Sequence, residues 1–241
     1  MIHEIITKYK NGNTEGAWAQ MHEVPVHNSD DGYEELWLLI KPKIEYNLEA
    51  IINGLIDEGY IFCENSYGLK SRSMDSIRQK PTEKNLELSR YISHKYGSLG
   101  FIFHKWIEEI GTININGYHP SWGELIENDP LWIEAHQDIE LNGEEWFINT
   151  EVIVPSYKFT YDFAPDSLHK ANISGSAPMR IGGPEYYFDS VVLDGNCHQF
   201  FTQYLNKYFR FGGFVDQNEC MYPEGSNIDF IHNIISQMIL I

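Results

Sequence analysis

Cysteine is scarce in this 241-residue sequence, and its pattern excludes two kinds of small scaffold. The three cysteines, Cys63, Cys197 and Cys220, are widely spaced and form no Cys-x-x-Cys pair. An odd number at this spacing argues against a disulfide framework and against a zinc knuckle. Free thiols fit a reducing compartment, so we expect a cytoplasmic protein.

Basic residues are the second scarce class. Lysine and arginine number 17 against 35 aspartates and glutamates, which gives a formal net charge of -18. Such a field repels phosphate backbones and anionic lipid surfaces, so we expect neither nucleic acid nor a membrane as a direct ligand. It attracts a basic partner, although acidity that serves only solubility is the simpler interpretation.

Long apolar runs are also missing. The first residues mix Glu4, Lys8 and Lys10 with apolar side chains, and no later run approaches the length of a membrane span, so we expect a soluble protein without a signal peptide. Hydrophobic residues nevertheless make up 42% of the chain and aromatic residues 14%. This composition predicts an ordered, aromatic-rich core.

The apolar periodicity changes along the chain and predicts the fold class. Helical spacing comes first, and alternating strand patterns follow after Gly111, separated by turn sequences. The order predicts an α+β fold with a largely antiparallel sheet flanked by helices and with helices at both the N- and C-terminal ends. We expect a mainly helical portion, residues 1–85, and an α+β portion, residues 86–241, in one compact unit.

Individual elements are predicted with different clarity. Residues 1–32 have no assigned structure, and residues 63–84 are expected to be an irregular surface excursion. Helices are expected over residues 33–59, 82–96, 100–110 and 227–241. Strands are expected near residues 60–62, 113–115, 131–133, 147–154 and 158–163.

The clearest element is an amphipathic helix over residues 197–211. Gln199, Gln203, Asn206, Lys207 and Arg210 share one side, and the apolar residues, including Phe201, Tyr204, Leu205 and Tyr208, share the other. We expect Asn196 and Gln199 to cap its first turn, and Gly212 or Gly213 to end it in a left-handed conformation.

Motifs for catalysis and metal binding are absent from the sequence. There is no phosphate-binding loop, no Gly-x-Ser-x-Gly, and none of the ten histidines has metal-ligand spacing. We therefore expect no cofactor and no metal. The most site-like group is Asp166, His169 and Lys170, but a helical turn capped by Asp166 is the interpretation that we favour. Trp122, between Pro120 and Gly123, is either an exposed recognition residue or part of the core.

The segment from Leu99 to Phe214 resembles the SUKH superfamily of bacterial immunity-type proteins, whose fungal relatives regulate cell-wall synthesis. The resemblance covers roughly half of the chain by short motifs. They are Phe101–Ile115, with its Phe-His-Lys-Trp-Ile-Glu-Glu-Ile-Gly core, Tyr118–Trp122, Asp129–Leu131, Leu168–Gly175 and Phe211–Phe214.

The resemblance implies an α+β fold and a non-enzymatic task, namely binding and blocking a basic toxin domain such as a nuclease. We expect the partner to contact a surface formed by Trp122, Asp162, Asp166, His169, Lys170 and Asn172. Two alternatives stay open. One is an enzyme, such as a hydrolase using Asp166 and His169, and the other is a regulatory scaffold.

Overall fold

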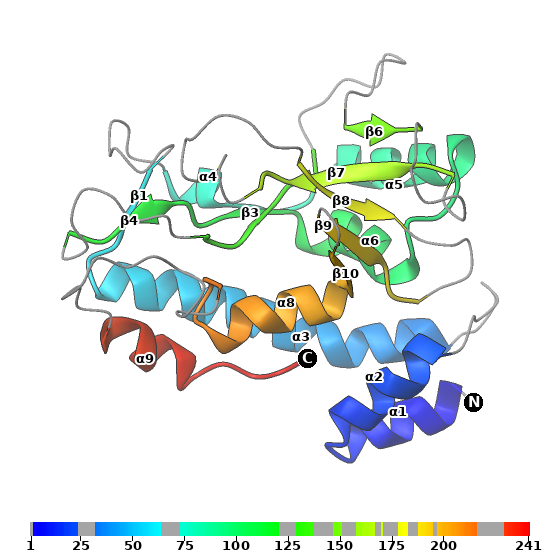
Figure 1. Cartoon of the computed structure of the whole chain (residues 1–241), viewed down its shortest axis with the longest axis horizontal. Coiled ribbons are helices and arrows are strands. Elements are labelled where there is room, and N and C mark those ends of the chain that lie inside the picture. Colours follow the sequence, from blue (N-terminus) through cyan, green and yellow to red (C-terminus); the bar gives the residue numbers. More distant parts are fainter. Residues whose placement is uncertain are drawn as a thin grey trace.

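The computed structural model has an α+β fold, as predicted, with N-terminal helices, antiparallel sheets and C-terminal helices (Figure 1). The description that follows covers residues 2–23, 32–63, 73–120, 129–136, 147–150, 158–166, 170, 178–182, 188–194, 197–215 and 229–241.

The N-terminal segment that the sequence left unassigned forms a helical hairpin. Helix α1 is Ile2–Lys10 and helix α2 is Thr14–Glu23, joined by a turn in which Gly12 has a φ of 80°. Isoleucines at one-turn spacing and Tyr9 bury the inner face of α1. The hairpin packs beside the next helix, α3 (Figure 1).

Helix α3, Gly32–Asp57, is the longest element of the described chain and runs through Pro42 without ending. Pro42 is exposed, so its ring points away from the core. The helical spacing of the sequence predicts one core-facing stripe, Ile44, Leu48, Ile51, Ile52, Leu55 and Ile56, and this is confirmed for all but Ile56, which is exposed. Gly59 follows the helix with a φ of 83°.

Three antiparallel sheets follow. Strand β1 (Ile61–Phe62) pairs with β4 (Gly117–Tyr118), and β3 (Thr112–Asn114) lies between β2 (Arg78–Gln79) and β5 (Trp132–Ile133). The largest sheet has the order β10-β9-β8-β7-β6. Its strands are β6 Ile148–Asn149, β7 Thr160–Ala164, β8 Met179–Gly182, β9 Val191–Asp194 and β10 Cys197–Phe200.

Helices α5 (Glu83–Lys95) and α6 (Phe101–Lys105) confirm the predicted pair before the sheets. Helix α6 continues as one π-helical turn, η1 (Trp106–Ile110). This turn ends at Gly111, whose N–H donates to Trp106 O at 2.9 Å.

The prediction of an irregular surface excursion over residues 63–84 is partly wrong, because helix α4 (Met74–Ile77) and β2 lie within it. Ile77 is buried whereas Met74 is exposed, so Ile77 is the residue by which α4 packs onto the core.

The predicted helix over 197–211 is wrong in its first four residues. These form β10, which pairs with β9 in the register Cys197↔Asp194 to Phe200↔Val191. Helix α8 (Phe201–Arg210) begins after it, and Gln203 Oε1 accepts from Phe200 N–H at 3.0 Å. The expected capping pair therefore lies four residues later than predicted. The end is confirmed, since Gly212 and Gly213 have φ values of 65° and 96°.

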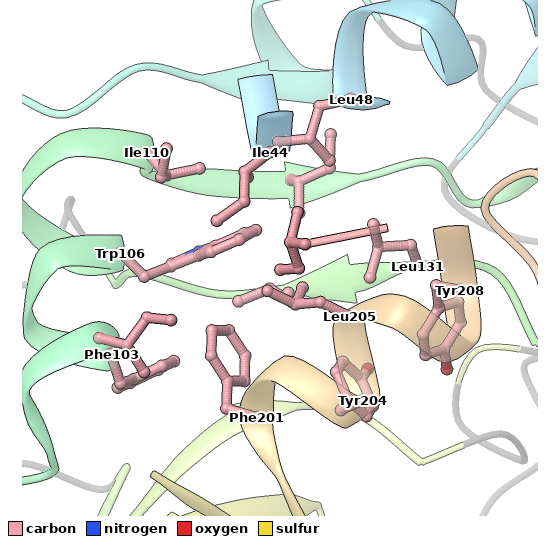
Figure 2. Close-up of a cluster of buried hydrophobic side chains, with 14 of the residues drawn as sticks. Ile44, Leu48, Phe103, Trp106, Ile110, Leu131, Phe201, Tyr204, Leu205 and Tyr208 are labelled. Atoms are coloured by element: carbon pink, nitrogen blue, oxygen red, sulfur yellow. The ribbon is translucent and has the colours of Figure 1, made fainter. Parts of the chain in front are cut away.

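The core gathers side chains from helices that are distant in sequence. Figure 2 shows Ile44 and Leu48 of α3 approaching Trp106 of η1 and Phe201 and Leu205 of α8. The last helix, α9, is Asp229–Ile235, shorter than predicted, and the chain beyond it runs along the protein to Ile241. Buried residues from Ile2 to Ile241 belong to one cluster, so the portions 1–85 and 86–241 share a core.

Candidate functional site

Lys170 is a fully buried lysine, and its surroundings define the candidate site. Its side chain has no exposed surface. The ammonium Nζ donates to Asp129 Oδ1 at 2.5 Å and to the Tyr208 hydroxyl at 3.1 Å. Because a buried charge is costly unless it is paired, these two acceptors keep the lysine in the interior.

Tyr208 of α8 completes a triangle with this pair. Its hydroxyl donates to Asp129 Oδ1 at 3.1 Å, and the Lys170 ammonium lies 5.2 Å from the centroid of its ring. Burial raises the pKa of the Tyr208 phenol well above its usual value, and neighbouring Tyr204 and Asp129 raise it further. The phenol therefore stays neutral and keeps its proton for the carboxylate.

The backbone of Lys170 is held as firmly as its side chain. Its N–H donates to Asp166 O at 3.0 Å, as in a helical turn, and its carbonyl accepts from Asn116 Nδ2 at 3.2 Å. Asn116 N–H in turn donates to Asn114 Oδ1 at 3.0 Å at the end of β3. Segments around residues 116, 129, 166 and 208 therefore meet at this lysine. We call Lys170, Asp129, Tyr208 and Asn116 the lysine cluster.

Three of the six predicted partner-binding residues lie in the described part of the chain, and three lie outside it. Trp122, His169 and Asn172 are outside the described residues. Asp166 is 7% exposed, and its backbone oxygen accepts a hydrogen bond from Lys170 N–H. Both residues are therefore buried and stabilise the fold in this structure.

Asp162 lies elsewhere, on β7 of the large sheet. Its Oδ1 is 3.0 Å from Arg180 Nε on β8. Burial raises the pKa of the Asp162 carboxyl, and the arginine opposes this rise. The backbone oxygen of Asp162 is also used, because it lies 2.7 Å from His136 Nε2. Asp162 therefore ties two strands together as well as carrying charge.

Sequence reasoning missed most of the lysine cluster. Asn128-Asp129-Pro130 is a typical turn sequence between two predicted strands, and Tyr208 belongs to the predicted apolar face of α8. Neither feature indicates that the two side chains meet. A lysine among turn residues is usually exposed, so the local sequence carries no signal that Lys170 is buried.

A second polar cluster, Ser89, His104 and Glu108, has the residue types of a catalytic triad but the wrong hydrogen-bond directions. Leu99 N–H donates to His104 Nε2 at 3.1 Å, so the proton of the neutral ring is on Nδ1. Nδ1 lies 2.9 Å from Ser89 Oγ, whose hydroxyl donates to Glu108 Oε1 at 2.7 Å. The imidazole therefore donates to the serine and cannot act as its base.

Among the described residues, no three side chains of His, Cys, Asp or Glu lie close enough together to hold a metal ion. Within the same ranges, no helix has both the length and the apolarity needed to cross a membrane.

Comparisons with protein-family models, with curated proteins and with solved structures give no match to this chain.

Proposed function

We propose that this protein is a non-catalytic binding protein that neutralises a basic protein partner, in the manner that its resemblance to SUKH immunity-type proteins implies. The distribution of charge carries the proposal. From Trp106 to Tyr157 the sequence has neither lysine nor arginine, and it contains the eleven acidic residues Glu108, Glu109, Glu124, Glu127, Asp129, Glu134, Asp138, Glu140, Glu144, Glu145 and Glu151.

Cations within the described residues compensate three of these carboxylates. Asp129 pairs with Lys170, and Glu108 and Glu109 lie 4.0 and 3.2 Å from the ammonium of Lys105. The described residues as a whole contain 21 acidic and 15 basic side chains, a balance of -6, so -12 of the formal -18 belongs to the remaining segments. Charge of one sign concentrated in this way attracts a cationic protein surface and speeds encounter with it.

The lysine cluster supports the proposal because it fixes Lys170 and Asp129, which are next in the sequence to residues expected to touch the partner or to attract it. Lys170 directly follows His169, and Asp129 follows Glu127 by two residues. One buried ion pair holds these two residues in place, so association has less conformational entropy to remove at them.

The first test is association kinetics with the purified product of the gene adjacent to this one. The decisive variant is Glu144→Lys/Glu145→Lys, and its matched control is Glu83→Lys/Glu87→Lys on α5, where both glutamates are exposed. We expect the first pair to slow association by roughly tenfold and the control pair by roughly twofold, because only the first lies in the acidic stretch.

Salt dependence provides the second readout. Raising the ionic strength should slow association far more than it speeds dissociation, because exposed charges are screened while buried contacts are not. Equal effects of the two charge-reversal pairs would show that net charge alone acts, without a defined surface. Absence of binding to any adjacent gene product, or association that ignores salt, would remove the proposal.

A further inference from the structure

A pocket of about 430 Å³ lies between α2 and α8 and is lined by none of the lysine cluster. Helix α2 contributes Trp18 and His22 to its wall, and α8 contributes Asn206, Lys207 and Arg210, with Phe211 following. The lining residues recur about once per turn on both helices, so the pocket runs along their facing sides. Its volume lies within the range of small-molecule sites.

The aromatic wall on α2 is held in position by neighbouring groups. The ring of His22 stacks on Phe200 at 3.5 Å and on Trp18 at 5.6 Å between centroids. His22 Nε2 lies 3.0 Å from Asp189 Oδ2, and that buried carboxylate oxygen also accepts from the Thr202 hydroxyl at 2.5 Å. A wall fixed in this way needs little ordering when a ligand arrives.

The chain at Ile241 holds two of the lining residues, Trp18 and Asn206, in place. Trp18 Nε1 donates to Ile241 O at 2.9 Å, and Asn206 Nδ2 donates to the same oxygen at 3.0 Å. Asn206 Oδ1 accepts from Ile241 N–H at 2.9 Å. These bonds occupy the polar side-chain atoms of Trp18 and Asn206. Both residues therefore shape the wall of the pocket, and Trp18 can offer a ligand only the apolar surface of its ring.

The opposite wall carries positive charge. Lys207 and Arg210 lie three residues apart on α8, and Glu15 is the one acidic residue among the described residues that line the pocket. In a sequence with 35 acidic and 17 basic residues, this local balance is reversed from that of the protein. An ammonium and a guanidinium one turn apart match the oxygens of a carboxylate or phosphate group.

We propose that this pocket binds a small aromatic acid, with its ring against Trp18 and Phe211 and its carboxylate or phosphate at Lys207 and Arg210. Aromatic rings supply a flat apolar surface, and the two cations fix the orientation of the ligand. The site is independent of the neutralising function, because its charge has the opposite sign and its lining residues are different.

The test is isothermal titration calorimetry with three probes. Indole-3-acetate supplies a ring with a carboxylate, phenyl phosphate supplies a ring with a phosphate, and indole-3-acetamide is the matched uncharged ring. We expect saturable one-to-one binding of at least one acid with a Kd below about 1 mM, and binding of the amide at least roughly tenfold weaker. The tighter acid identifies the anionic group that the pocket prefers.

Three variants connect this binding to the pocket. Arg210→Gln should weaken binding of the acid at least roughly fivefold, whereas Arg90→Gln, which removes an exposed arginine from α5, should change it less than roughly twofold. Ala19→Phe fills the pocket from an exposed position on α2 and should abolish binding. Circular dichroism and thermal melting confirm that each variant is folded.

Three results would overturn the proposal. They are failure of both acids to bind at about 5 mM, equal affinity for the acid and the amide, and unchanged binding in folded Ala19→Phe. Each leaves the neutralising function unaffected, because that function is measured with a protein partner.

Discussion

The Lys170 ammonium and the Asp129 carboxylate form an ion pair at 2.5 Å, yet the two partners are unequally enclosed. The lysine side chain is 0% exposed and the aspartate side chain is 15% exposed. Water can therefore reach the anion when it is left alone, but it cannot reach the cation. This asymmetry makes the two halves of the pair experimentally distinguishable.

Asp129→Asn should destabilise the protein more than Lys170→Met. The first variant strands a fully buried ammonium, at a cost of about 3–5 kcal/mol, whereas the second leaves a partly hydrated carboxylate, at about 1–3 kcal/mol. Urea denaturation of both variants measures the difference, and Asp57→Asn at an exposed site is the control. A larger loss for Lys170→Met would mean that the ammonium is better hydrated than its burial indicates.

Gly111→Ala and Gly59→Ala separate backbone strain from steric contact. The two glycines have similar φ values, 88° and 83°, but a Cβ on Gly111 would lie 2.2 Å from Gln79 O, and one on Gly59 would meet nothing within 4 Å. We expect Gly59→Ala to cost about 1–2 kcal/mol from the left-handed conformation alone. Gly111→Ala should cost clearly more, because it also breaks the pairing of β2 with β3. Equal melting temperatures for the two variants would contradict this.

His104 should make the protein less stable at mildly acidic pH. Burial lowers the pKa of its imidazole from 6.5 to about 4, so between these values the unfolded chain binds more protons than the folded one. The stability that neutral His104 provides is complete above pH 6.5 and is lost as the pH falls toward 4. His104→Gln should therefore be less stable near pH 7.5 but decline less steeply on acidification.

The measurement for His104 is urea denaturation at about pH 7.5, 6 and 5. His94→Gln, at an exposed position on the neighbouring helix α5, is the control and should follow the unmodified protein at each pH. A His104→Gln curve parallel to the others would show that this histidine does not set the acid sensitivity.

Substitutions on the two faces of α8 should differ in their effect on the free energy of unfolding. Leu205 is fully buried among the side chains drawn in Figure 2, so Leu205→Ala should cost about 2–5 kcal/mol. Arg210→Ala on the exposed face should cost less than about 0.5 kcal/mol. The cost of Gln203→Ala should lie between these values, because Gln203 Oε1 accepts a hydrogen bond from Phe200 N–H. Chemical denaturation that ranks the three variants otherwise would contradict the assignment of faces.

The sequence predicted the elements whose burial is periodic. The stripe from Ile44 to Leu55 and the face containing Phe201 and Tyr208 were found, because a helix buries one residue in every three or four. The left-handed glycines after α8 were found because their chemistry is local. The α+β class followed from the order of the periodic segments.

The sequence did not predict elements that depend on a partner strand. Residues 197–200 continue the helical pattern of α8, but hydrogen bonds to β9 hold them extended. The polar residues of β2 form a strand because β3 lies beside them. The same limitation applies to the sites. Asp129 is 41 residues from Lys170, and His22 is 167 residues from Asp189, so only the fold brings these groups together.

The hydrogen bond between Trp18 and Ile241 has a consequence for folding during synthesis. The two residues are 223 positions apart, so the wall of the pocket cannot be completed until the chain has been translated to Ile241. Closing so long a loop is entropically costly and occurs after local helices have formed. On the ribosome, helices α1 and α2 should therefore remain accessible to chaperones and proteases until the segment ending at Ile241 emerges and holds them in place.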